Sequence, residues 1–226
     1  DDHANINKMG TFRTYTVKVE GSDITFKNLT IENNAAQLGQ AVALHTEGDR
    51  LKFINCRILG NQDTIYTGAK FTRLYFKDCY IDGTTDFIFG PSTALFENCM
   101  IHSKRNSYVT AASTPKEAKY GYIFKHCKLT AEPGVGKVYL GRPWRPYAYT
   151  LFIECELGKH IVPAGWHNWG KQSNEETARY MEYKNTGEGA NVSERVAWSK
   201  QLTKKEAEAV TVDAIFGTQS NWNPID

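Results

Sequence analysis

The sequence predicts an all-β fold, a parallel β-helix in which short strands stack coil upon coil. Repeats of roughly 20 to 50 residues are typical of solenoids, and the units here are rich in Phe, Ile, Tyr and Thr, lack a helical period and are too short for a strand-helix-strand unit. Six segments of the 226-residue chain align on the pattern Phe-x-x-Cys-x-Ile, at gaps of 27, 23, 20, 28 and 28 residues: ITFKNLTI, LKFINCRIL, LYFKDCYI, ALFENCMI, YIFKHCKL and TLFIECEL. A stack of such single-strand units is a β-helix.

Within each unit the chain is expected to turn a corner just before the Cys position. Phe and Cys are three residues apart and would point to opposite faces of a straight strand, whereas Cys and Ile, two apart, share a face. All three can point inward only if the chain bends. The corner residues are Asn, Asp or His in five units, types that tolerate a left-handed backbone. Glu154 fits poorly in the sixth unit, and the last coil is expected to turn differently.

Two ladders of apolar side chains should fill the interior. One ladder is aromatic and the other aliphatic: Phe26, Phe53, Phe76, Phe96, Phe124 and Phe152, and Ile31, Ile58, Ile81, Ile101, Leu129 and Leu157. All five cysteines occupy the same place in the repeat, with Leu29 there in the first unit. We expect these cysteines to be small buried hydrophobic residues. Disulfides are not expected, because stacked cysteines point the same way and their number is odd.

The chain divides into a β-helix domain at 1–170 and a tail at 171–226 that packs on it. In the tail, Thr203 starts a short helix and Glu206 completes a capping box. The net charge is +2 and the lysines are scattered, which argues against a nucleic-acid partner. No apolar run approaches the roughly 18 residues of a membrane span.

Asp63 and Asp86 each lie seven residues after a ladder cysteine, Cys56 and Cys79. Equal offsets on neighbouring coils place the two carboxylates about one strand spacing apart, roughly 5 Å. Two acids at this short separation ionise at different pH values, so one can serve as an acid while the other serves as a nucleophile or base. Coincidence, or two structural turn aspartates, is the alternative interpretation of the pair taken alone.

The surroundings of the acids favour chemistry. Gln62 precedes Asp63 and Gln40 lies one coil earlier, and amide N–H donors beside carboxylates suit a developing oxyanion. Tyr66 and Phe89 follow the two aspartates at the same offset of three and should form an aromatic wall. Loop glutamines are otherwise ordinary surface residues, and core packing is the alternative for Phe89.

Arg142-Pro143-Trp144 displays a guanidinium and an indole at a fixed separation, since proline stiffens the link. Arginine can hold a carboxylate in a fork, and tryptophan can stack on a sugar ring. In PAGWHNW, one of Trp166 and Trp169 is expected to extend the aromatic floor. The six histidines are scattered and no C-x-x-C pair exists, so neither a metal nor a cofactor is expected.

Taken together, these motifs resemble the pectin methylesterase (pectinesterase) family of right-handed β-helix enzymes, over nearly the whole chain. The resemblance rests on GQAVAL at 39–44, GNQDTIY at 60–66, GTTDFIFG at 83–90 and YLGRPW at 139–144. YVTAASTP at 108–115 is more similar to bacterial members than to plant ones.

The resemblance implies a role for each matching residue. Asp86 would be the nucleophile that attacks the methyl ester, and Asp63 the general acid for methanol and then the base for water. Gln62 and Gln40 would hold the oxyanion. Arg142 would orient Asp86 and keep it ionised.

The resemblance also implies a substrate and a location. The substrate would be pectin, a methylated homogalacturonan, contacted by Trp144, Tyr66, Phe89 and, as a weaker match, Trp166. A cell-wall substrate implies a secreted or periplasmic protein. Family members have further N-terminal coils before the strand that matches TFRTYTV, whereas about ten residues precede it here. We therefore expect the first coils to be missing, the open end to be covered by a missing segment or another chain, and residues 1–226 to be incomplete as an enzyme.

Two other functions fit parts of the pattern. Aspartates about 5 Å apart would also suit a retaining glycosidase on pectic polysaccharide, whereas a lyase would be expected to need an acidic Ca²⁺ cluster that is not evident. A non-catalytic solenoid could bind polysaccharide through Trp144, Tyr66 and Trp166.

Overall fold

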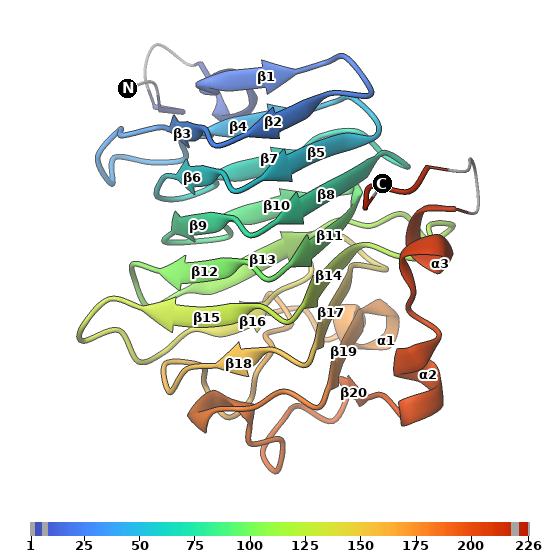
Figure 1. The fold of residues 1–226 in the computed structure, drawn as a ribbon. Helices are drawn as coiled ribbons and strands as arrows, with labels where there is room; N and C mark the ends of the chain where they lie inside the picture. Colours follow the sequence, from blue (N-terminus) through green and yellow to red (C-terminus); the bar gives the residue numbers. More distant parts are fainter. Residues whose placement is uncertain (1–2, 6–8, 218–221, 226) are drawn as a thin grey trace.

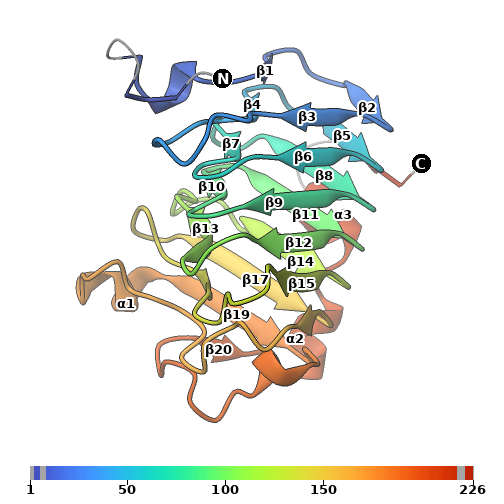
Figure 2. The same ribbon diagram turned by 90° about the vertical axis from the view of Figure 1, so that its left-hand side faces the viewer.

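The computed structural model describes residues 3–5, 9–217 and 222–225. The chain winds into stacked coils with three parallel sheets running along the stack (Figures 1 and 2). Sheet A contains six strands in the order β1 (Val17–Val19), β4 (Leu44–Thr46), β7 (Ile65–Thr67), β10 (Ile88–Gly90), β13 (Tyr108–Ala112) and β16 (Tyr139–Gly141). The predicted right-handed parallel β-helix is confirmed.

The two other sheets carry the repeat pattern. Sheet B contains β2 (Thr25–Lys27), β5 (Leu51–Ile54), β8 (Arg73–Lys77), β11 (Thr93–Glu97), β14 (Tyr122–Lys125), β17 (Tyr149–Ile153), β19 (Arg179–Tyr183) and β20 (Lys200–Gln201). Sheet C contains β3 (Thr30–Glu32), β6 (Arg57–Leu59), β9 (Tyr80–Gly83), β12 (Met100–Ser103), β15 (Lys128–Ala131) and β18 (Glu156–Leu157). In each unit the Phe lies in sheet B and the Ile or Leu in sheet C, so the corner between them joins the two sheets.

The corner residues are left-handed in all six units, with φ between 50° and 56°. Glu154 adopts φ 51° like the others, so the expectation that the last coil turns differently is wrong. Its backbone N–H donates to the carbonyl of Tyr183 on the next coil at 2.8 Å, as the other corner residues donate to theirs. Stacking between coils therefore overrides the residue preference at this position.

The predicted aromatic ladder is present. Successive phenylalanine rings from Phe26 to Phe152 stack with centroids 4.4–5.0 Å apart and interplanar angles of 4–10°. The five cysteines are free and at most 2% exposed, and each thiol contacts backbone carbonyls. Leu29 is 47% exposed at the same ladder position, because β3 is the outermost strand of sheet C in the described chain.

The C-terminal residues pack on the outer face of sheet B (Figure 1). Val210, Ile215 and Phe216 are buried against the outward side chains of β8, β11, β14 and β17. Strands β19 and β20 continue sheet B beyond residue 170, so the coils extend past the boundary expected between domain and tail. The helices of the described residues are η1 (Thr11–Arg13), α1 (Ser173–Thr177), η2 (Glu188–Ala190), α2 (Lys204–Glu208) and α3 (Val212–Phe216).

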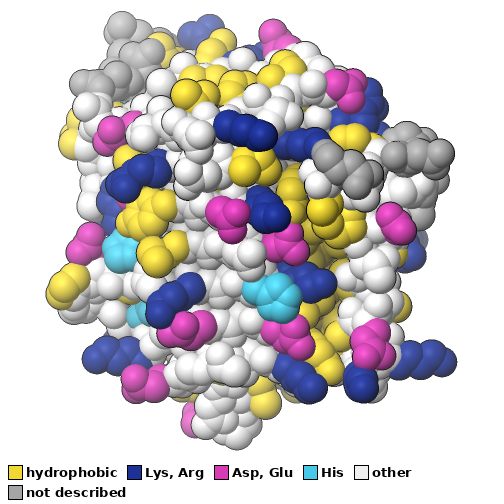
Figure 3. Space-filling model, in the orientation of Figure 1, with side chains coloured by type: hydrophobic (Ala, Val, Ile, Leu, Met, Phe, Trp, Pro, Cys, Tyr) yellow, Lys and Arg dark blue, Asp and Glu magenta, His cyan; other side chains and the backbone are white. Residues whose placement is uncertain are grey.

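The capping box of α2 is formed as predicted, since Thr203 accepts from the Glu206 N–H and the Glu206 carboxylate accepts in return. Charged side chains of both signs are interspersed on the face drawn in Figure 3. None of the helices in the described residues is long and apolar enough to cross a membrane.

Candidate active site

The parallel register of sheet A brings Asp63 and Asp86 side by side. Ile65 pairs with Ile88 and Tyr66 with Phe89, so each aspartate lies two residues before a paired position. Both aspartates adopt left-handed backbone conformations, with φ 69° for Asp63 and 50° for Asp86. The Asp63 N–H donates across to the next coil at 3.0 Å, and the Asp86 N–H does the same at 2.8 Å. The equal offsets in the sequence therefore predict their placement.

The two carboxylates line a cleft of about 170 Å³ on the outer face of sheet A. Asp63 is 4% exposed and Asp86 is 6% exposed. The cleft collects side chains from η1, from four consecutive coils, from the loop after β16 and from the segment after β18: Thr11, Phe12, Gln40, Gln62, Asp63, Asp86, Phe89, Ala111, Arg142, Trp144 and Trp169. Tyr66 adjoins this lining through its ring contact with Phe89.

Arg142 holds Asp86 in a two-pronged ion pair. Its Nε donates to Oδ1 at 2.9 Å and its Nη2 to Oδ2 at 2.6 Å. Burial raises the pKa of Asp86, and the hydrogen bonds and charge of Arg142 work against that rise. The arginine therefore favours an ionised Asp86.

The environment of Asp63 favours its protonated form. Burial raises the pKa of Asp63 well above its usual range, and the negative charge of Asp86 raises that pKa further. A hydrogen bond from Gln40 and the more distant charge of Arg142 act in the opposite direction. Asp86 thus ionises first, and the pair consists of one carboxylate and one carboxylic acid over a range of pH.

Gln40 and Gln62 pair with each other across adjacent coils as an isolated parallel bridge. The Thr11 hydroxyl donates to Gln40 Oε1 at 2.7 Å, which leaves the amide NH₂ of Gln40 as the group that donates toward Asp63. Gln62 reaches the same cleft. Two side-chain amides therefore border the space in front of the acids, where an oxyanion would need donors.

Aromatic rings form one wall of the cleft. Tyr66 stacks on Phe89 at 4.7 Å between centroids, Phe12 contacts Tyr66 at 4.7 Å, and Phe89 contacts Trp144 edge to face at 5.8 Å. Phe89 packs with Val42 and Ala111 in a small cluster outside the main core. The wall is therefore built on the outside of the coil, where a ligand can reach it.

The expected contact of Trp166 with a substrate is corrected by the structure. Trp166 is 1% exposed, stacks on Tyr180 at 4.4 Å and donates from Nε1 to Glu182 at 3.3 Å. It bridges to Gly141 as the next coil of sheet A, which turns its side chain inward. Trp169, the other tryptophan of this segment, lines the cleft instead.

Sequence reasoning missed Thr11 and Phe12, because they lie in η1, outside the repeat that gave the two aspartates their positions. Ala111 was missed as well, and its place beside Phe89 in the register of β10 and β13 could have indicated it.

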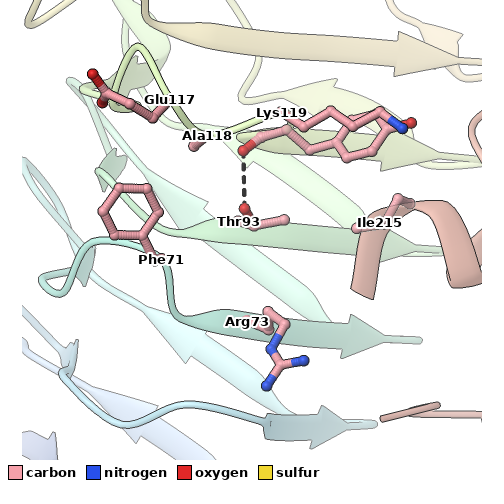
Figure 4. Close-up of a pocket in the computed structure, with 8 residues that line it drawn as sticks. Phe71, Arg73, Thr93, Glu117, Ala118, Lys119 and Ile215 are labelled. Atoms are coloured by element: carbon pink, nitrogen blue, oxygen red, sulfur yellow. Dashed lines mark hydrogen bonds between the residues drawn. The ribbon is translucent and has the colours of Figure 1, made fainter. Parts of the chain in front are cut away.

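A larger pocket of about 440 Å³ lies between sheet B and α3 (Figure 4). It is lined by Phe71, Arg73, Thr93, Glu117, Ala118, Lys119, Tyr120 and Ile215, and Thr93 donates across it to the Tyr120 carbonyl at 2.9 Å. Among the described residues that line it, Glu117 is the single acid. The chemistry of paired carboxylates therefore points to the smaller cleft on sheet A.

Comparisons with known proteins identify the family of the chain. The family model described as Pectinesterase matches residues 2–219, and the chain belongs to the pectinesterase family. It is 45% identical to Pectinesterase 31 of Arabidopsis thaliana over 88% of this chain and 62% of that protein. It is 40% identical to Putative pectinesterase 11 of the same plant, over 85% of this chain and 54% of that protein.

Solved structures show the same fold. The pectin methylesterase from carrot superposes with a TM-score of 0.86 at 33% identity, covering 92% of this chain and 69% of the carrot chain. Pectin methylesterase PemA from Erwinia chrysanthemi gives 0.80 at 30% identity, covering 96% and 75%. The identities of these plant proteins to the chain are 45%, 40% and 33%, and that of the Erwinia protein is 30%, and these values do not test the local similarity of YVTAASTP to bacterial members. The chain spans about 62% and 54% of the length of the two Arabidopsis proteins.

Proposed function

We propose that the chain hydrolyses methyl esters of polygalacturonate in pectin and releases methanol. The observation that carries this proposal is the pair of unlike acids: Asp86, whose ionised form a bidentate arginine favours, beside Asp63, whose protonated form burial and the charge of Asp86 favour. Family membership supports the same reaction. So does the similarity of the fold to a pectin methylesterase that was solved in complex with a hexasaccharide.

In the first half of the reaction, an Asp86 oxygen forms a bond to the ester carbonyl carbon. The carbonyl π electrons move to the oxygen, and the amides of Gln40 and Gln62 donate to the oxyanion. As the carbonyl reforms, the bond to the methoxy oxygen breaks and Asp63 gives that oxygen its proton. Methanol leaves, and the galacturonate acyl group remains joined to Asp86 as an anhydride.

In the second half, Asp63 is a carboxylate and accepts a proton from a water molecule that attacks the anhydride. The acyl bond to Asp86 breaks, so Asp86 is again a carboxylate and Asp63 again an acid. The products are a free galacturonate carboxyl group and methanol. Tyr66, Phe89 and Trp144 contact the sugar rings, whereas the buried Trp166 does not. A cell-wall polymer as substrate implies a secreted or periplasmic protein.

The test is methanol release from methylated pectin by the wild-type chain and by Asp86→Asn. Asp78→Asn is a matched control, because Asp78 occupies a left-handed corner that neighbouring coils fill with asparagine. We expect methanol from wild type and control, and a loss of at least a thousandfold in Asp86→Asn. New reducing ends without methanol would instead indicate a glycosidase, and unchanged pectin binding without turnover by any variant would indicate a binding solenoid.

A further inference from the structure

Arg142 contacts two aromatic rings as well as Asp86. Its guanidinium carbon lies 3.9 Å from the centroid of the Tyr108 ring and 3.7 Å from that of the Trp169 ring. Two rings at such short distances from the same carbon cannot share one face of the guanidinium without overlapping, so they cover opposite faces. The edge nitrogens Nε and Nη2 point in the remaining direction, in the plane, at the two oxygens of Asp86.

The Trp169 side of this sandwich has its own support. Trp169 adopts a left-handed backbone with φ 62°, which is strained for a bulky residue. The Trp169 N–H donates to His167 Nδ1 at 3.0 Å, and the His167 ring lies 5.3 Å from that of Tyr108. Burial and the charge of Arg142 lower the pKa of His167, which favours the neutral ring in which Nδ1 accepts this hydrogen bond. One histidine thus contacts both halves of the sandwich.

We propose that Tyr108 and Trp169 are positioning residues that clamp the guanidinium plane of Arg142 and thereby keep Asp86 oriented and ionised for attack. The proposal rests on the proposed function, because it assigns these rings a part in that reaction. It extends the function to two residues that the acid pair and its amide donors do not include.

The physical reason lies in the geometry of the fork. A bidentate hydrogen bond requires the guanidinium and the carboxylate to stay nearly coplanar, and the long arginine stem does not enforce this by itself. Rings on both faces permit little rotation out of that plane and add cation–π attraction. They also exclude water from the cation, which strengthens its effect on Asp86. In the part of the chain that the structure describes, the charged and titratable groups that act on Asp86 are Arg142, Asp63 and, from the core, Tyr180.

Trp169 also lines the cleft, so stacking on a sugar is the rival role for it. Tyr108 is not part of the cleft lining, and its side chain reaches the site through Arg142. Its backbone carbonyl accepts the Asp86 N–H at 2.8 Å, a contact that a side-chain substitution leaves in place. The two roles differ in their kinetic signature. A sugar contact acts on KM, whereas a clamp acts on kcat and on the pH at which Asp86 ionises.

The experiment compares Tyr108→Leu and Trp169→Leu with Tyr108→Phe and Trp169→Phe, which keep an aromatic face. For the leucine variants we expect kcat on methylated pectin to fall roughly tenfold, KM to change less than about twofold, and the acid limb of the pH profile to move up by about one unit. The phenylalanine variants should stay within about threefold of wild type. In an Arg142→Lys background, the leucine substitutions should add nothing further.

A raised KM with unchanged kcat and pH profile in Trp169→Leu, together with wild-type behaviour of Tyr108→Leu, would overturn the clamp. Circular dichroism verifies that each variant is folded. The pKa of Asp86, followed by ¹³C NMR of its carboxyl group, gives a readout that needs no activity. If wild type releases no methanol, the proposed function fails, yet an upward shift of that pKa in the leucine variants still supports the clamp, and its absence still refutes it.

Discussion

Replacement of Arg142 by glutamine tests the electrostatic basis of the site. The substitution removes the cation and leaves a polar side chain in the space. Two unit charges about 4 Å apart attract by about 4 kcal/mol at the effective dielectric constant of about 20 that suits such pairs. One pKa unit corresponds to about 1.36 kcal/mol, so the full effect would be about 3 units. Water entering the vacated space reduces it, since the Arg142 side chain is 18% exposed, and we expect about 2 units.

The assay is kcat/KM for methanol release as a function of pH. The acid limb reports ionisation of Asp86 in the free enzyme, and the alkaline limb reports loss of the proton of Asp63. In Arg142→Gln the acid limb should move up by about 2 pH units toward the alkaline limb, so the maximum value of kcat/KM also falls. Arg145→Gln is the matched control, because Arg145 contacts Trp144 and not Asp86. An acid limb that stays in place in Arg142→Gln would refute the assignment of Asp86 as the ionised partner.

Three further predictions concern stability and reactivity. Because burial raises the pKa of Asp63 above its value in the unfolded chain, the fold loses stability as the pH rises through the folded pKa. Asp63→Asn should therefore abolish turnover yet raise the Tm at pH 8, by about 2–4 °C for each kcal/mol of this electrostatic cost that the substitution removes. A lower Tm would contradict this. Arg195→Met should cost about 3–5 kcal/mol in urea unfolding, because it removes the cation that pairs with the buried Glu182 carboxylate. Adding Glu182→Leu should recover part of the loss if this ion pair is responsible. The five buried thiols should react with DTNB only after denaturation, and rapid labelling of the folded protein would show that the ladder opens.

The repeat made most of the fold predictable, because a fixed offset from the ladder cysteine gives the coil, the sheet and the inward or outward direction of a side chain. The phenylalanine ladder, the left-handed corners and the adjacency of Asp63 and Asp86 all follow from it. Residue preference was the weaker guide, since Glu154 turns the corner as asparagine does once hydrogen bonds from the next coil are formed.

Prediction failed where the repeat gave no position. After Cys155 the spacing is irregular, and nothing in PAGWHNW says which tryptophan faces the core. The structure buries Trp166 against Tyr180 and places Trp169 in the cleft. Thr11 and Phe12 precede the first unit and reach the site through the short η1 helix, a tertiary placement that no local pattern encodes.

The same stacking has opposite energetic effects on the inside and on the outside of the coil. Parallel, in-register coils place like side chains next to each other, so Phe76 stacks on Phe96 in the core and is stabilised there. The rule applied to sheet A places Asp86 beside Asp63, where like charge and burial are unfavourable. One arginine, Arg142, contacts only one of the two acids, and this asymmetry separates the pKa values of two chemically identical residues. A second arginine beside Asp63 would remove the remaining electrostatic cost of burying that acid. It would also ionise both acids, which would leave no proton for the departing methanol. The unfavourable pairing is therefore the condition for the proposed reaction.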